Sequence, residues 1–304
     1  MRLPNFLIIG AARSGTTSLY RALNQHPQVF MSPLKEPGFF AYGGQLCDFY
    51  YHVGNPNMRV VIVTDLEEYA KLFQGATDEL AIGEASTDYL YNPTGSAPER
   101  IQHYIPDAKL IAILRNPVQT VYSHFLYGIQ LGLEPLDDFE QALQVEDERI
   151  RNNWGPFYHY QRKGFYGRQL KPYFDRFGRE QIRVYLYDEW AGDSTRTLRD
   201  VFRFLGVDDA FAPDTAAKAR VSGLPRSGEL HRILTTHNRI RSLARQLVPQ
   251  AVRGRVRLAL LNRNLTKPQL AAETRWHLIE QYRNDILELE VLIERDLSHW
   301  LRGA

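Results

Sequence analysis

A small-residue loop near the N-terminus has the composition of a phosphate-binding turn. Residues 10–17 read GAARSGTT and directly follow the apolar run Phe6–Ile9. Glycines let a backbone turn tightly and bring its N–H groups toward a ligand. The N-terminus of a following helix adds partial positive charge. The loop therefore predicts a phosphate site, with Arg13 as the nearby cation.

The loop departs from a nucleotide triphosphatase motif at an informative position. Its spacing is close to G-x4-G-K-[ST], but Thr16 stands where the lysine should be. Triphosphatases use that lysine on the β- and γ-phosphates and an acid to help hold magnesium. Here the apolar run Lys109–Leu114 ends in Arg115 rather than in an aspartate. The pattern favours a ligand without a γ-phosphate and a site without a metal. A P-loop phosphotransferase that uses ATP and magnesium is the alternative.

A second candidate anion site follows the run Lys109–Leu114. Arg115 comes directly after this run, and Ser123 lies two helical turns further along. A guanidinium is a planar fork of donors and a serine is a hydroxyl donor, so the two can converge on one anion. Together with the first loop, they indicate a nucleotide that carries phosphates at two separated places.

The elements that position these residues alternate between strands and helices. This order predicts an α/β fold, with a P-loop-like central parallel sheet flanked by helices on both faces and ligands at the carboxyl ends of the strands. The predicted strands are Phe6–Ile9, Leu80–Ile82, Lys109–Leu114 and Ile182–Tyr187. The predicted helices are Thr17–Leu23, one after Asp65, Val118–Leu131, Asp138–Ile150, Tyr166–Phe177, Thr195–Leu205 and Ala271–Leu301.

The bulk composition limits the possible classes of protein. The 304 residues carry 37 Lys and Arg against 35 Asp and Glu, so no global field attracts nucleic acid. The single cysteine, Cys47, cannot form an internal disulfide. We find no signal peptide and no apolar run long enough to span a membrane, and expect a cytoplasmic protein. We expect one domain, 1–304, with a C-terminal helical region at about 228–304 packed on it. The oligomeric state is not indicated.

Several motifs in order resemble the PAPS-dependent sulfotransferases, where PAPS is 3′-phosphoadenosine 5′-phosphosulfate. The resemblance is strongest to the branch that includes the heparan sulfate enzymes and many bacterial proteins. The motifs are FLIIGAARSGTTSLYRALNQHP, KEPGFF, GEASTDYLY, LIAILRNPVQTVYSHF, VSGLPRS and the final DLSHW. The resemblance implies transfer of the sulfuryl group of PAPS to a hydroxyl or amine by in-line displacement. It leaves 3′-phosphoadenosine 5′-phosphate (PAP) as the product and requires no metal.

The resemblance also implies which residues hold PAPS. The 5′ side would be held by Arg13, Ser14, Gly15, Thr16, Thr17 and Ser18. Arg115 and Ser123 would hold the 3′-phosphate. A loop near residue 220 would close over the cofactor, with contacts from Arg220, Ser222, Gly223 or Arg226.

The chemistry requires an in-line acceptor, a base and positive charge over the transferred group. Arg13 fits the third role, although the heparan sulfate enzymes carry a lysine there; arginine keeps the charge but does not give up a proton. Glu36 matches the base of that branch, with pairing to Lys35 at the surface as the alternative. His124 is the second candidate base, since imidazole titrates in the useful range.

The acceptor is expected to be a carbohydrate or another small molecule. Besides Lys35, Glu84 and Ser86 could shape its site. Residues 152–166 (NNWGPFYHYQRKGFY) are rich in aromatic and basic side chains, so Trp154 and Tyr158 could stack on a sugar. Packing in the core is the competing explanation for these rings. The sequence does not decide between O- and N-sulfation, nor what the arginine-rich residues 239–263 do.

Overall fold

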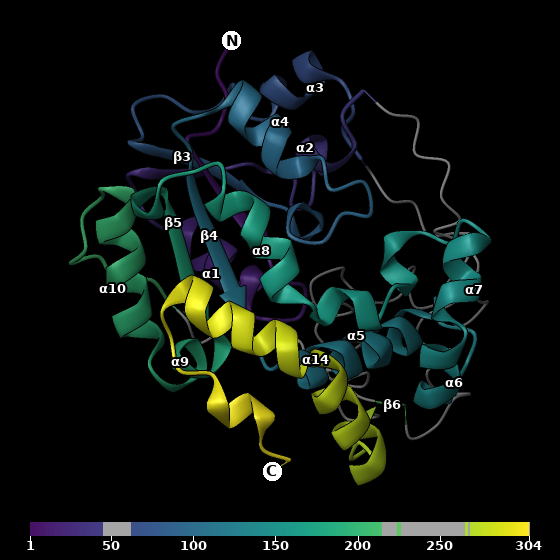
Figure 1. The fold of residues 1–304 in the computed structure, drawn as a ribbon. Helices are drawn as coiled ribbons and strands as arrows, with labels where there is room; N and C mark the ends of the chain where they lie inside the picture. The colour runs from purple at the N-terminus through teal and green to yellow at the C-terminus, as the bar shows by residue number, and fades with distance from the viewer. Residues whose placement is uncertain (45–61, 215–223, 226–264, 267, 304) are drawn as a thin grey trace, which may run out of the picture.

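A five-stranded parallel sheet forms the centre of the computed structural model, which describes residues 1–44, 62–214, 224–225, 265–266 and 268–303 (Figure 1). Its strands are β1 (Phe6–Gly10), β2 (Val29–Met31), β3 (Ala81–Ala85), β4 (Lys109–Leu114) and β5 (Ile182–Leu186). Their order is β2-β3-β1-β4-β5, and each neighbouring pair is parallel. The strand that precedes the phosphate loop, β1, is therefore central, with β3 on one side and β4 on the other.

Helices cover both faces of this sheet, as predicted. Side chains alternate along a strand, so Leu7 and Ile9 belong to one buried cluster and Phe6 and Ile8 to the other. The first cluster includes α2 (Phe39–Tyr42), α4 (Ala97–Tyr104), α5 (Pro117–Leu131), α8 (Tyr166–Phe174) and α14 (Ala272–Ile293). The second is closed by α1 (Thr16–Leu23) and α10 (Ser194–Leu205). A parallel sheet buried on both faces explains the almost continuous apolar strands.

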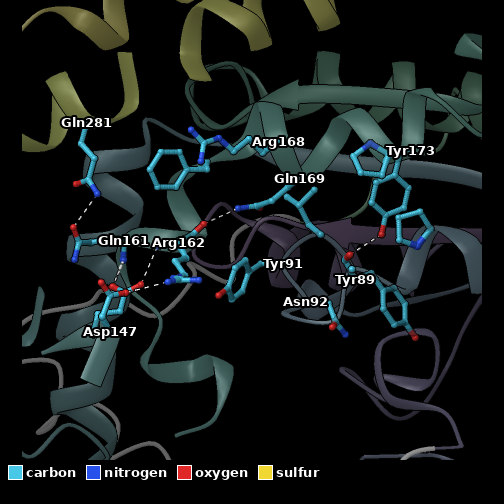
Figure 2. A pocket seen from close by; sticks show the side chains of 16 residues that line it. Tyr89, Tyr91, Asn92, Asp147, Gln161, Arg162, Arg168, Gln169, Tyr173 and Gln281 are labelled. Atoms are coloured by element: carbon cyan, nitrogen blue, oxygen red, sulfur yellow. Dashed lines mark hydrogen bonds and ion pairs between the residues drawn. The ribbon is translucent and has the colours of Figure 1, made fainter. Parts of the chain in front are cut away.

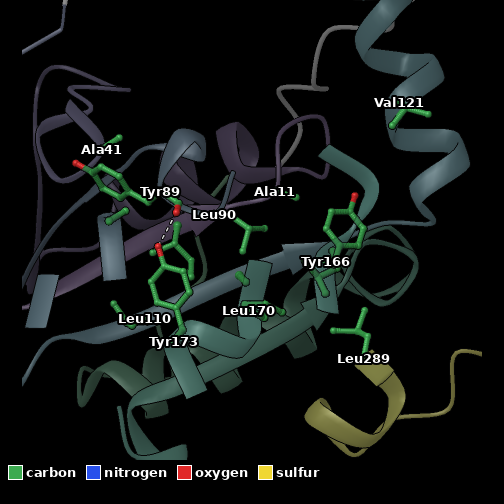
Figure 3. Packing of buried hydrophobic residues seen from close by; sticks show 14 of the residues in the cluster. Ala11, Ala41, Tyr89, Leu90, Leu110, Val121, Tyr166, Leu170, Tyr173 and Leu289 are labelled. Atoms are coloured by element: carbon green, nitrogen blue, oxygen red, sulfur yellow. Dashed lines mark hydrogen bonds between the residues drawn. The ribbon is translucent and has the colours of Figure 1, made fainter. Parts of the chain in front are cut away.

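The first cluster shows how aromatic side chains join the sheet to its helices (Figure 3). Tyr173 of α8 is fully buried, and its hydroxyl donates to the carbonyl oxygen of Tyr89 at 2.6 Å. Leu170 of α8 and Leu110 of β4 lie in the same cluster. This packing fixes the segment around Tyr89, which follows β3, beneath the carboxyl edge of the sheet.

Local signals set most of the predicted boundaries. The strand Lys109–Leu114 is confirmed at both ends. Helix α5 begins at Pro117 after an Asn116 cap and ends before Gly132, which has φ 69°. Both are favourable, because proline fits a first helical turn and glycine adopts the left-handed conformation that ends a helix.

Some predicted elements were wrong in extent. The single helix expected at Asp138–Ile150 is two helices, α6 (Phe139–Gln144) and α7 (Glu146–Arg151). Tyr187 begins helix α9 (Tyr187–Gly192) rather than ending a strand. The prediction also missed β2 and α4, whereas α3 (Leu66–Lys71) is the helix expected after Asp65. The remaining short elements are the 3-10 turns η1 (Thr87–Tyr89), η2 (Pro156–Tyr158), η3 (Gln161–Gly164), η4 (Arg179–Gln181) and η5 (Ser298–Leu301), with the antiparallel pair β6 (Leu224–Pro225) and β7 (Leu265–Thr266).

The C-terminal segment forms the long helix α14 and the turn η5 rather than one helix to Leu301. Helix α14 packs on α8 and α5 (Figure 1). Its side chains Tyr282 and Leu289 are fully buried. Of the expected region 228–304, most of the first half lies outside the described residues. In the described part of the chain, no helix combines the length and the apolar character needed to cross a membrane.

Candidate functional site

Three of the predicted motifs meet at one edge of the sheet. Because all five strands are parallel, the loops after them leave from the same side. The phosphate loop follows β1, Ser86 follows β3 and Arg115 follows β4. These three strands are neighbours, so their loops are neighbours as well.

The phosphate loop presents the first turn of α1 without a side-chain cap. Gly15 precedes α1 with φ 100°, a conformation that favours glycine. A Cβ atom added there would lie 3.3 Å from the Trp190 ring, so the close approach also requires glycine. Ser14 and Thr16 are buried beneath the turn, and Thr17 is exposed. The N–H groups of the first turn are thus available to an anion.

Arg13 connects this loop to α5. Its Nε lies 3.4 Å from Ser123 Oγ, to which it donates a hydrogen bond. Its guanidinium carbon lies 4.3 Å from the centroid of the Tyr127 ring, also on α5. The two predicted anion sites are therefore in contact through Arg13 and Ser123.

Arg115 is oriented by an aromatic ring and by α5. Its guanidinium carbon lies 4.7 Å from the Tyr187 ring centroid, and its Nε donates to Gln119 Oε1 at 3.1 Å. Gln119 and Ser123 are four residues apart and so share one face of α5. Arg115 therefore lies on the side of α5 that carries Ser123.

The Glu36 carboxylate is held by the loop after β3. The Glu36 N–H donates to the Ala85 carbonyl oxygen at 2.9 Å. Glu36 Oε2 accepts from the backbone N–H of Thr87 at 2.6 Å and from its hydroxyl at 3.2 Å. Glu36 Oε1 pairs with Lys35. The side chain is still 42% exposed, so the carboxylate is fixed but accessible.

Glu84 and Ser86 are buried and lie below this surface. Glu84 accepts hydrogen bonds from the hydroxyls of Tyr69 (3.1 Å), Tyr89 and Ser86 (3.0 Å). Burial raises the pKa of Glu84 to about 7. Ser86 Oγ also accepts from the N–H of Gly38 at 3.1 Å, which ties the loops after β2 and β3 together. In this arrangement both residues support the site from beneath.

His124 is buried with one ring nitrogen unpaired. Its Nε2 lies 2.9 Å from the Phe157 carbonyl oxygen, which identifies Nε2 as the protonated nitrogen. Nδ1 is buried and has no partner among the described residues. Burial lowers the pKa of His124 well below its ordinary value, and the charges of Lys163 and Arg13 lower it further. The imidazole is therefore neutral, with a lone pair on Nδ1.

The two aromatic acceptor candidates differ. Tyr158 is fully buried, and its hydroxyl donates to the Leu133 carbonyl oxygen at 3.3 Å, so its ring has no surface for a sugar. Trp154 is partly exposed, with the guanidinium of Arg149 at 4.7 Å from its ring centroid. Arg149 itself forms a buried ion pair with Glu134 at 2.7 Å. Core packing explains Tyr158 better than stacking does.

A cavity of about 540 Å³ lies beside the site and contains none of the predicted site residues (Figure 2). The segment Tyr89–Asn92 forms one wall, and η3 and α8 contribute much of the rest. Within that wall, Leu90 packs so closely on the phosphate loop that a Cβ on Gly10 would lie 2.6 Å from its Cβ atom. Leu90 therefore both lines the cavity and contacts Gly10, the first residue of the phosphate loop.

Several predicted residues lie outside the described part of the chain. They are Cys47, Arg220, Ser222, Gly223, Arg226 and the segment 239–263. Conversely, the sequence analysis did not identify five residues that lie next to the predicted site residues in the structure: Thr87, Tyr127, Lys163, Tyr187 and Trp190. Tyr187 and Trp190 could have been found, because they follow a strand end on the same edge as the phosphate loop. Across the described residues, no cluster of His, Cys, Asp and Glu is arranged to hold a metal.

Comparisons with known proteins place the chain in a family. A model described as "Sulfotransferase family" matches residues 4–212, so the chain belongs to the sulfotransferase family. The crystal structure of a sulfotransferase from Alicyclobacillus acidocaldarius is 32% identical, with a TM-score of 0.77 over 99% of this chain and 100% of that one. The chain is a transferase of the P-loop-like α/β type.

Mammalian relatives are longer. Carbohydrate sulfotransferase 15 of Mus musculus is 29% identical over an alignment that covers 67% of this chain and 44% of that protein. Bifunctional heparan sulfate N-deacetylase/N-sulfotransferase 4 of Mus musculus is 24% identical over 99% of this chain and 31% of its own length. The match thus spans less than half of each of these relatives. Family membership does not favour the phosphotransferase alternative.

Proposed function

We propose that this protein transfers the sulfuryl group of PAPS to a hydroxyl or amine of a carbohydrate or small-molecule acceptor. The observation that carries the proposal is the contact between Arg13 and Ser123. It joins the loop after β1 to the helix after β4, so that two anion sites lie next to each other. A nucleotide with separated 5′ and 3′ anionic groups matches that arrangement.

The described residues fit such a nucleotide. The uncapped first turn of α1, beside Arg13, suits the 5′-phosphosulfate, because backbone N–H groups and the helix dipole favour an anion there. Arg115, held over Tyr187, and the Ser123 hydroxyl suit the 3′-phosphate. When bound, PAPS supplies the sulfuryl group, whose sulfur bonds to the acceptor atom as its bond to the 5′-phosphate oxygen breaks to leave PAP.

Glu36 is the base in this proposal. Its carboxylate is fixed by Thr87 and Lys35 but keeps an exposed side, so an acceptor hydroxyl can reach it. It takes the acceptor's proton as the new bond forms, a role typically worth about 10²–10⁴-fold in rate. Arg13 balances the negative charge that develops on the 5′-phosphate.

His124 is the second candidate for the base. Its Nε2 is engaged by the Phe157 carbonyl oxygen, and its ring is buried. Its unpaired Nδ1 can accept a hydrogen bond, which suits an orienting role toward the acceptor.

Sulfotransferases named for carbohydrate and heparan sulfate are among the relatives, and they support a carbohydrate as the acceptor class.

Calorimetric titration with PAP, compared with ATP plus magnesium, tests the cofactor. We expect PAP to bind without metal and to bind more tightly than ATP with magnesium. If only ATP with magnesium bound, the proposal would be contradicted and a phosphotransferase would be supported.

The second experiment tests the base, with PAPS and an acceptor found by screening carbohydrates. The Glu36→Gln variant should lose about 10²-fold or more in turnover while its affinity for PAP is unchanged.

A further inference from the structure

Lys163, in the turn η3, is a buried lysine without an ion-pair partner among the described residues. The residue is 6% exposed. Its ammonium lies 4.7 Å from the centroid of the Tyr91 ring. Lysines are rarely buried unless they are paired, because removing an ammonium from water is costly. A contact with one aromatic face compensates for only part of that cost.

The carboxylates near Lys163 attract its charge but form their hydrogen bonds with other groups. Glu146 accepts hydrogen bonds from the backbone N–H groups of Gln161 at 2.6 Å and Arg162 at 3.1 Å. Asp88 accepts from the hydroxyl of Tyr42 at 2.9 Å. Neither is paired with Lys163 in the ion pairs of the described residues. The ammonium therefore keeps hydrogen-bond donors for a ligand.

Lys163 also lies among the residues of the proposed reaction. The turn η3 packs against α5, which carries His124. The positive charges of Lys163 and Arg13 both lower the pKa of His124. Burial lowers the pKa of Lys163 itself, and the nearby carboxylates of Asp88, Glu146 and, to a smaller extent, Glu36 act in the opposite direction. Lys163 is thus close enough to interact electrostatically with Glu36, the candidate base, and with His124. Arg13 also interacts with His124.

We propose that the ammonium of Lys163 binds the oxygens of the sulfuryl group, as a second cation in addition to Arg13. This inference rests on the proposed function. The sulfuryl oxygens are anionic, and a charge-assisted hydrogen bond in a water-poor site is strong. Bound sulfuryl oxygens would also supply the partner that the buried ammonium lacks. PAP has no sulfuryl group, so Lys163 should contribute to binding of PAPS and not of PAP.

The test compares the dissociation constants of PAPS and PAP by calorimetry, without acceptor, in wild type and in Lys163→Met. Methionine keeps an unbranched side chain and removes the charge. We expect PAPS to bind about tenfold to a hundredfold more weakly in the variant, and PAP to stay within about twofold of wild type. Lys163→Gln is measured in the same way if Lys163→Met does not fold. Lys163→Arg, which keeps the charge, should restore part of the preference for PAPS.

Lys109→Gln is the matched control. The Lys109 ammonium also lies over a ring, 5.7 Å from the Phe204 centroid, but on the other face of the sheet. The Lys109→Gln substitution should leave the dissociation constants of PAPS and PAP unchanged. An equal loss of PAP and PAPS binding in Lys163→Met, or no loss at all, would overturn the assignment. If wild type binds neither nucleotide, the proposed function itself fails, which is a distinguishable result.

Discussion

Helices α1 and α5 both begin directly after a central strand, at the same edge of the sheet, but their N-termini differ. Gly15 precedes α1 and has no side chain with which to cap it. Asn116 precedes α5, and its side chain accepts from the N–H groups of Val118 at 3.0 Å and Gln119 at 3.3 Å. Pro117, the first residue of α5, has no N–H to offer.

The difference indicates two ways of binding an anion. At α1 the backbone is left available, so the helix terminus can bind a phosphate group directly. At α5 the backbone donors are already satisfied, so an anion there must be bound by side chains such as Arg115 and Ser123. Substitutions at the two termini should therefore have different consequences for PAP binding.

The largest effect is expected for Gly15→Ala. A Cβ atom would be strained at φ 100° and would crowd Trp190 at 3.3 Å, displacing the first turn of α1. PAP affinity, measured by calorimetry, should fall by about a hundredfold or more, and stability by about 1–3 kcal/mol. Gly132→Ala is the control, because Gly132 has φ 69° at the other end of α5 with open space around it. We expect Gly132→Ala to destabilise the protein to a comparable degree but to leave PAP affinity unchanged. If Gly132→Ala lost as much PAP affinity as Gly15→Ala, the proposed difference between the two helix N-termini would be contradicted.

Arg115→Ala should have the next largest effect. Loss of a guanidinium that binds phosphate should weaken PAP by about tenfold to a hundredfold. Binding of adenosine 5′-phosphate, which lacks the 3′-phosphate, should hardly change. Arg183→Ala is matched to it, since the Arg183 guanidinium lies 4.8 Å from the Phe204 ring centroid, away from the site. A similar loss in both variants would remove Arg115 from the 3′ site.

The smallest effect on binding is expected for Asn116→Ala. Loss of the cap should lower the free energy of unfolding by about 1 kcal/mol in a denaturant titration. PAP affinity should change by less than about threefold, because the freed N–H groups were not ligands. A large gain in affinity would show that the α5 backbone can bind the anion once it is uncapped.

The sequence predicted the elements with sharp local signals. The phosphate loop was identifiable from an apolar run that ends in glycines, and Arg115 from a strand that ends before a proline. The short strand β2 was missed because Val29–Met31 is only three residues long and has no period to detect. The break between α6 and α7 was missed as well. The Glu146 carboxylate that opens α7 is held by backbone groups of residues 161 and 162, a contact far along the chain.

The site was predicted only as far as residues adjacent to those signals. Thr87 donates a hydrogen bond to Glu36, and Lys163 lies near both Glu36 and His124. These residues come from separate loops, which meet only because of the strand order. Strand order is a property of tertiary packing and is not written in any one segment. Tyr158 shows the converse, because an aromatic side chain in a polar-rich segment gives no local indication that it will be buried.

The buried carboxyl of Glu84 couples folding to proton uptake. Its pKa of about 7, against an ordinary value of 4.5, means that the folded chain binds a proton that the unfolded chain releases between these values. The contribution of Glu84 to the free energy of unfolding should therefore fall as pH rises through this window, by up to about 3 kcal/mol, and level off above it. Glu84→Gln should reduce that slope. Glu146, whose pKa burial also raises to about 7, contributes in the same direction, whereas His124 and His159, whose pKa burial lowers, contribute in the opposite direction. The difference between wild type and Glu84→Gln therefore measures the Glu84 contribution.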